Sequence, residues 1–336
     1  MTNFSAPPAE SIQTLAETRV LENADLSRCD LSNTDLSNCV LTQVSFNRAN
    51  LSGVDLSGAV FNECDLRDAM LNDVKAAQVE ASLVDFSGAT MQGADFSGAL
   101  FDQCLFDNSN LTNASFDRAT TSRCVFTNTN FTRANLFRWS ALETDLSTVT
   151  FSQTNLGKAH LTRSILEGQT FSGCDLTLTM FLQCLMGKAN FEGMSLAQTQ
   201  FTQSSLAGAR FSGVQASFVS FVECDLTGAD LRESYFKMVN ATDATLGMAK
   251  LDKSQWIQCV LARANCGGAS WTASILDSCD LSHALLDDGD FSLARLETVN
   301  LHAISDARAR WDSAKLKGVL RTDSKLLVAE TWRAKI

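Results

Sequence analysis

The chain contains only two prolines, Pro7 and Pro8, and both lie near its N-terminal end. No apolar run approaches the roughly 18 residues that a membrane-spanning helix needs. No basic segment followed by an apolar one marks a signal peptide, and no Gly/Ser linker interrupts the middle. These absences argue against a membrane protein and against separate linked domains. We expect a cytoplasmic protein, with secretion that needs no signal peptide left open.

A basic surface is missing as well. The formal net charge is -11, and most of the excess acid lies in the N-terminal third of the chain. This charge argues against a body that binds nucleic acid directly through Lys and Arg. The C-terminal end is locally basic, which favours a helix-terminal or subunit contact there.

A period of five residues dominates the sequence. A large apolar residue, which we call the centre, recurs at nearly every fifth position from Leu21 to Leu316 without one insertion or deletion. The residue two positions before each centre, which we call the inner residue, is nearly always small. A step of two keeps both side chains on one face of an extended segment, and the other three residues suit an outward position and a corner. Neither a helix nor a plain strand has this spacing, so the chain must turn every five residues.

The repeats resemble those of pentapeptide-repeat proteins, whose pattern is a small residue, Asp or Asn, Leu or Phe, and two variable residues. ADLSR at 24–28, ANLSG at 49–53 and ANFEG at 189–193 are examples. The resemblance covers most of the chain. It implies an all-β solenoid, a right-handed quadrilateral β-helix of about 15 coils with about 20 residues per coil.

We therefore expect one continuous pentapeptide-repeat β-helix over residues 21–320. A short N-terminal cap is expected over residues 1–20 and a C-terminal helical cap over residues 321–336. The segment after Pro8 can form a short helix, and Asp323 or Ser324 can cap the second one. Caps are needed because the end coils of a stacked sheet leave backbone groups unpaired.

Aromatic residues support a coil of about 20 residues. Phenylalanines recur 20 residues apart and should stack as a ladder of rings. They are Phe131, Phe151, Phe171, Phe191 and Phe211.

Trp139 occupies a normally small inner position near the undersized centres Thr121 and Ala141. We expect it to fill the volume that they leave, because an empty void would cost about 24 cal/mol per Å³.

No enzyme site follows from this pattern. Cys266 is a centre and the other cysteines are inner residues, so all 11 should point inward as small free thiols. His160, His283 and His302 should point outward on different coils, away from any cysteine that could share a zinc ion. We expect no catalytic residue, no cofactor and no metal.

Apolar residues at outward positions carry the leading functional hypothesis. In a coil of about 20 residues they should gather along one edge, and such an exposed strip marks an interface. The hypothesis is a non-enzymatic protein-binding rod or scaffold, with an unknown protein partner, that acts through this strip or through its ends. The resemblance also implies that the C-terminal helix can join two monomers into a homodimer. The strip consists of Leu100, Leu105, Val125, Ile165, Met180 and Leu185, with Leu182 nearby.

The alternative hypothesis is an acidic DNA mimic, because several pentapeptide-repeat proteins bind DNA gyrase, a topoisomerase, as duplex-like rods. About 15 coils would span about 70 Å, and duplex of that length carries roughly 40 negative charges. The net charge of -11 is far smaller, so the acid would have to be focused on one face. A third alternative, an accessory or effector protein of a bacterial secretion system, has no specific residue in its support. The candidate acidic residues spread over three faces: Asp25, Asp30, Asp35, Asp55, Asp65, Asp85 and Asp95.

Overall fold

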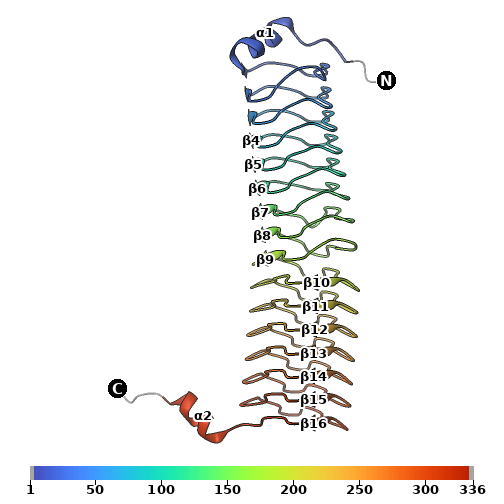
Figure 1. Ribbon diagram of the computed structural model, residues 1–336, viewed down its shortest axis with the longest axis vertical. Coiled ribbons are helices and arrows are strands. Elements are labelled where there is room, and N and C mark those ends of the chain that lie inside the picture. Colours follow the sequence, from blue (N-terminus) through green and yellow to red (C-terminus); the bar gives the residue numbers. More distant parts are fainter. Residues whose placement is uncertain (1–3, 333–336) are drawn as a thin grey trace. The chain divides into compact units, whose positions relative to one another are not determined.

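The computed structural model describes residues 4–332 and confirms the predicted all-β solenoid. The chain forms a parallel β-solenoid of about 15 turns with about 20 residues per turn, and a short helix lies near each end (Figure 1). It divides into two compact units, with the boundary between Thr179 and Met180. Each unit is described separately below.

The first unit begins with α1 (Ala9–Thr18), followed by strands of three residues that recur once per turn. Successive strands pair in parallel, as Val20 with Val40. Three further ladders of β-bridges, such as Asp25 with Ser45, give each turn four sides. The strands are β1 (Val20–Glu22), β2 (Val40–Thr42), β3 (Val60–Asn62), β4 (Glu80–Ser82), β5 (Leu100–Asp102), β6 (Thr120–Ser122), β7 (Ser140–Leu142) and β8 (His160–Thr162).

The second unit begins with β9 (Met180–Leu182) and ends with α2 (Ser324–Thr331). Strands β10 to β16 pair in order and in parallel. Within the 20-residue turn, these strands start five residues before the place where β1 to β8 start. The three-residue strand therefore lies on a different side of the turn in β10 to β16. These strands are β10 (Ser195–Ala197), β11 (Gln215–Ser217), β12 (Tyr235–Lys237), β13 (Gln255–Ile257), β14 (Ile275–Asp277), β15 (Arg295–Glu297) and β16 (Lys315–Lys317).

Nearly every corner has a residue in the left-handed region. The second residue after almost every centre has a positive φ, as at Arg28 (58°) and Gly53 (70°). On most sides the centre carbonyl then accepts a hydrogen bond three residues on, as Leu26 C=O does from Cys29 N–H at 3.2 Å. Glycine adopts this conformation without strain and is frequent at these corners, together with arginine, glutamine and asparagine. The chain thus turns every five residues, as predicted.

Several polar inner residues donate a hydrogen bond to a carbonyl of the turn before them. Thr129 Oγ1 donates to the carbonyl of Phe106 at 2.7 Å, and Thr154 Oγ1 donates to that of Phe131 at 2.8 Å. Cys104 Sγ makes the same contact with the carbonyl of Ala81 at 3.4 Å. All 11 cysteines are free, so several of them are weak hydrogen-bond donors as well as small fillers.

The predicted aromatic packing is visible inside each unit. Phe131 and Phe151 stack with ring centroids 6.0 Å apart, and Phe151 stacks on Phe171 at the same distance. In the second unit Phe191 and Phe211 stack at 4.7 Å. The ladder within each unit therefore consists of nearly parallel rings.

Trp139 is fully buried in the first unit, next to two phenylalanine rings. Its ring lies 6.1 Å from that of Phe126 and 6.0 Å from that of Phe131. Thr121 and Ala141, the two undersized centres, are buried as well. The large inner side chain therefore lies in the part of the core where the centres are small.

Both terminal helices form as predicted, and they differ in what they cover. In α1, Leu15 is buried, and the helix contacts β1. Asp323 caps α2 by accepting hydrogen bonds from Lys325 N–H and Leu326 N–H. However, Leu316 in β16 remains 42% exposed, so α2 does not cover the last turn. Residues 1–3 and 333–336 of the predicted caps lie outside the described residues. No helix among the described residues is long and apolar enough to cross a membrane.

Candidate apolar interface and other surface sites

Four exposed apolar side chains gather at one corner of the first unit. Leu100 lies in β5, and Leu105 follows it around the corner on the next side. Leu105 is the direct bridge partner of Val125, and Leu83 N–H donates to the Asp102 carbonyl of the same corner at 3.1 Å. Their exposed fractions are 51% for Leu83, 49% for Leu100, 38% for Leu105 and 36% for Val125. We call these four residues the corner patch.

A shallow hollow of about 200 Å³ adjoins the corner patch at Leu100. It lies over Ala81, a small centre paired in the sheet between Phe61 and Phe101. The outward residues Glu80 and Leu100 lie on the border of this hollow. An apolar side chain of a partner could therefore enter the surface beside Leu100.

The other residues of the predicted strip do not all join the corner patch. Ile165 is half-buried, and Asp145 lies between it and Val125 in their ladder. Met180, Leu182 and Leu185 belong to the second unit; Met180 is half-buried, and the two leucines are 36% and 49% exposed.

Sequence reasoning missed other apolar residues of the first unit. Leu83 is a member of the corner patch at a corner position, where the repeat rarely has an apolar residue. Val20 and Val40 occupy outward positions and are each 37% exposed. An apolar residue at a corner or outward position was the available signal in each case.

The seven candidate acidic residues have a structural role. Each accepts, through Oδ1, a hydrogen bond from the backbone N–H two residues later, as Asp25 does from Ser27 at 2.9 Å. These bonds stabilise the turn after each outward position, which explains why Asp and Asn are preferred there. The other six bonds join Asp30, Asp35, Asp55, Asp65, Asp85 and Asp95 to the N–H two residues on.

Arginines neutralise part of this acid. Arg19 pairs with Asp35 at 2.7 Å, and its hydrogen bond holds the pKa of that carboxyl below its usual range. Arg67 lies between two carboxylates, 2.7 Å from Asp65 and 3.7 Å from Asp85. The seven residues also lie on three different ladders of the first unit. The acid is therefore dispersed and partly paired, which is a poor imitation of a phosphate backbone.

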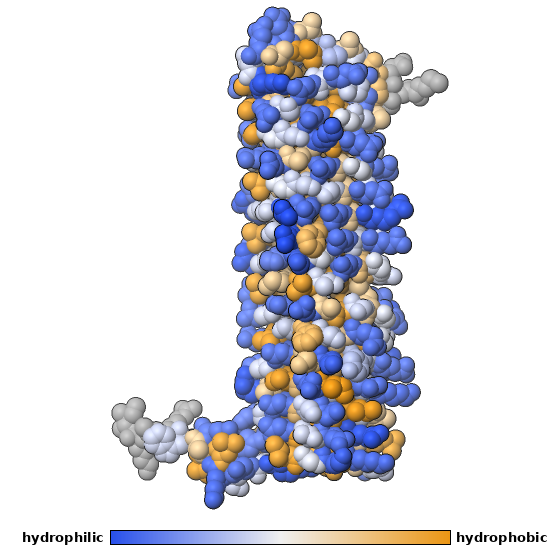
Figure 2. Space-filling model, in the orientation of Figure 1, coloured by the Kyte–Doolittle hydropathy of each residue, from blue (hydrophilic) through white to orange (hydrophobic). Residues whose placement is uncertain are grey.

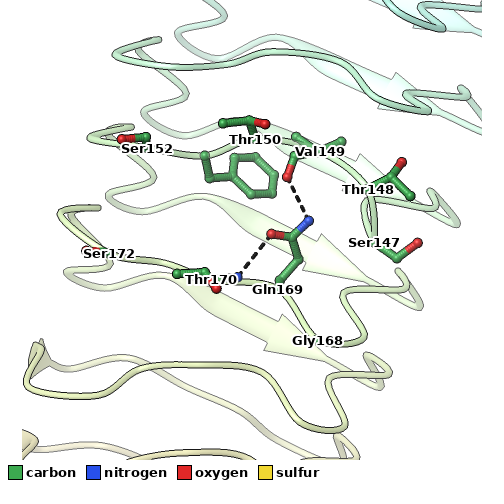
Figure 3. A pocket seen from close by; sticks show the side chains of 10 residues that line it. Ser147, Thr148, Val149, Thr150, Ser152, Gly168, Gln169, Thr170 and Ser172 are labelled. Atoms are coloured by element: carbon green, nitrogen blue, oxygen red, sulfur yellow. Dashed lines mark hydrogen bonds between the residues drawn. The ribbon is translucent and has the colours of Figure 1, made fainter.

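Gln169 opens a second hollow, of about 400 Å³, between two turns of the first unit (Figure 3). Its amide Nε2 donates to the carbonyls of Leu146 at 2.6 Å and Val149 at 2.8 Å, while Oε1 accepts from Thr170 N–H at 3.2 Å. Within residues 4–332, the ladder bond expected from Phe151 N–H to the Thr170 carbonyl is not formed. The side-chain amide thus takes the place of a backbone contact and holds the turns apart. The lining is rich in Ser and Thr hydroxyls.

The histidines differ from the prediction. His302 is buried, with only 5% exposed, and its ring centroid lies 5.4 Å from that of His283. The expectation that all three histidines point outward was therefore wrong for His302. The reason is that Glu330 of α2 contacts both imidazoles and Asp323 N–H donates to His302 Nδ1. His160 is exposed in β8.

The family is established by comparison with protein-family profiles. Eight matches to the family described as pentapeptide repeats cover more than half of the chain, and the chain therefore belongs to the pentapeptide-repeat family. A comparison with curated proteins gives no match. The matched segments are residues 24–62, 49–88, 64–108, 109–137, 143–181, 184–217, 209–247 and 220–255.

Solved structures of pentapeptide-repeat proteins show similarity to this chain. HetL, involved in heterocyst differentiation regulation in the cyanobacterium Nostoc sp. strain PCC 7120, is 20% identical over 95% of this chain and 98% of its own, with a TM-score of 0.21. QnrB1, a plasmid-mediated fluoroquinolone resistance protein, is 17% identical over 75% of this chain and 98% of its own, with a TM-score of 0.26. At these values neither similarity supports a shared function.

Proposed function

We propose that the protein is a non-enzymatic binding scaffold that contacts a protein partner through the corner patch of its first unit. The observation that carries this proposal is the cluster of four exposed apolar side chains on neighbouring turns, where the repeat normally places polar residues. Isolated apolar residues are common on protein surfaces, but a contiguous group more often marks an interface. The hollow over Ala81 offers a place for one anchoring side chain.

The test uses the double variant Leu100→Asp/Leu105→Asp. Both side chains point outward, and aspartate is common at such positions, so the fold should be retained. A matched control is Val260→Asp/Leu285→Asp, whose side chains are 37% and 45% exposed at outward positions of the second unit. We expect the first variant to lose, and the control to keep, the partner that co-purifies from the native cell. Equal partner recovery from both variants would contradict the proposal.

A second contact, between two copies of the chain, is supported by the C-terminal end. β16 is the last strand of its sheet, and Leu320 and Val328 are 64% and 67% exposed. Figure 2 shows hydrophobic side chains on α2 and on the last turns beside it. Light scattering should report a dimer that Leu320→Asp converts to a monomer. A monomeric wild-type protein would rule this contact out.

The DNA-mimic alternative receives less support, because the acidic side chains stabilise turns and are partly paired with arginine. A gyrase supercoiling assay with and without the protein separates the two hypotheses. We expect no inhibition of supercoiling and no protection of gyrase from quinolones. Either effect would restore the alternative.

A further inference from the structure

Two histidines and a glutamate converge in the second unit, where Glu330 of α2 contacts two histidines of the solenoid. Glu330 Oε2 lies 3.1 Å from His302 Nε2 and 3.3 Å from His283 Nε2. Each residue offers one ligand atom, and the three ligand atoms lie within 4.8 Å of one another. We propose that His283, His302 and Glu330 form a binding site for a divalent transition-metal ion of the zinc type.

The spacing of the ligand atoms fits such an ion. Zinc binds imidazole nitrogen and carboxylate oxygen at about 2.0–2.2 Å, so two ligands of a tetrahedral site lie about 3.3–3.5 Å apart. The two distances to Glu330 Oε2 are close to this value. Two imidazoles and one carboxylate are a donor set that suits zinc, cobalt or nickel more than calcium or magnesium.

The backbone holds the two imidazoles next to each other. His283 N–H donates to the carbonyl of His302 at 2.8 Å, which fixes the two segments in the same ladder. His302 N–H donates to Asn300 Oδ1 at 3.0 Å. Two of the three ligands therefore come from the rigid solenoid, and only Glu330 comes from the helix.

Asp323 sets the position of the third ligand. Its carboxylate caps the first turn of α2, and Glu330 follows seven residues later, about two helical turns on. Asp323 N–H also donates to His302 Nδ1 at 3.1 Å. This bond ties the start of the helix to the same imidazole that Glu330 contacts near the other end.

Ion binding requires a proton to move. In the metal-free chain Nδ1 of His302 accepts from Asp323, so the neutral ring carries its proton on Nε2, which donates to Glu330. When the ion takes the Nε2 lone pair, that proton moves to Nδ1, and the bond from Asp323 N–H is lost. The side chains of His283 and Glu330 are 39% and 35% exposed, so water can complete the coordination. The ion would thus connect α2 to the solenoid more firmly than the hydrogen bonds do.

Metal titration of chelator-treated protein without a polyhistidine tag tests the site. We expect one Zn²⁺ per chain by isothermal titration calorimetry and a tetrahedral absorption spectrum with Co²⁺. Glu330→Gln, which keeps the size of the side chain, and His283→Ala should each weaken binding at least about tenfold, because even loss of outer-shell partners costs that much. His160→Ala is the matched control and should bind as the wild type does.

A second readout reports on α2. Trypsin should cleave after Lys325 more slowly when Zn²⁺ is present, and Glu330→Gln should remove this protection. All variants keep the 11 cysteines, so binding to thiols would be equal in all of them. Absence of stoichiometric binding, or equal affinity in wild type and Glu330→Gln, would overturn the proposal and leave the cluster as a hydrogen-bonded anchor of the helix.

Discussion

Two neighbouring tryptophans of the second unit allow the cost of an unsatisfied polar group to be measured. Trp256 and Trp271 are both centres, both fully buried, and their ring centroids lie 5.7 Å apart. Trp256 Nε1 donates to Ser254 Oγ at 3.0 Å, whereas Trp271 Nε1 has no hydrogen-bond partner among the described residues. The perturbation is Trp→Phe at each site, made singly because neighbouring changes are not additive.

The expected difference follows from the hydrogen bonds. Both substitutions remove the same atoms from a packed core, so the packing costs are similar. Trp256→Phe also loses a hydrogen bond worth about 1 kcal/mol, whereas Trp271→Phe removes a buried unsatisfied donor that costs about 1–3 kcal/mol. Trp271→Phe should therefore be less destabilising than Trp256→Phe by about 2 kcal/mol or more.

Hydrogen exchange is a suitable assay because a repeat array need not unfold in one step. Peptides covering residues 251–276 report the local free energy of opening. A difference of about 2 kcal/mol corresponds to roughly a 30-fold difference in protection. If Trp271→Phe loses as much protection as Trp256→Phe, or more, the reasoning is refuted. Trp139, whose Nε1 also has no partner among the described residues, should behave as Trp271 does.

Two further predictions concern the core and the hollow. Gln169→Ala should destabilise the first unit by about 3 kcal/mol, since it removes three side-chain hydrogen bonds of about 1 kcal/mol each. Hydrogen exchange at residues 147–172 should then be faster than in the exposed control Gln198→Ala, and unchanged exchange would contradict the prediction. Burial raises the pKa of the Cys266 thiol to about 12, so about one molecule in ten thousand carries the thiolate at pH 8. Iodoacetamide should therefore leave Cys266 unmodified in the native protein and label it after unfolding, and reactivity should rise as the pH approaches 12; rapid native labelling at pH 8 would contradict this burial.

The period of five residues was sufficient to predict the solenoid, because each position in the repeat has one environment. The place of a residue in the repeat decides its environment: Leu26 is a centre and is buried, whereas Asp25 just before it points outward. The terminal helix at Ala9–Thr18 and the cap at Asp323 were also predictable, because helix-forming and capping signals are local. These features depend on residues close together in the sequence.

The parts that escaped prediction depend on contacts between distant segments. Glu330 contacts His302 across 28 residues of sequence, and no local pattern encodes that contact. Gln169 is unusual in sequence, but its role requires knowing which carbonyls of the previous turn lie within reach.

Because the repeat length is constant, the position of each surface residue can be calculated from its number in the sequence. In each unit the position of a residue within a turn gives its side of the solenoid, and the turn number gives its height, so Leu105 and Val125 are vertical neighbours by arithmetic. An outward residue can change without altering either coordinate, because the centre and the inner residue fill the core. A new binding surface could therefore be designed on this protein one outward position at a time, without a change to the residues that fill its core.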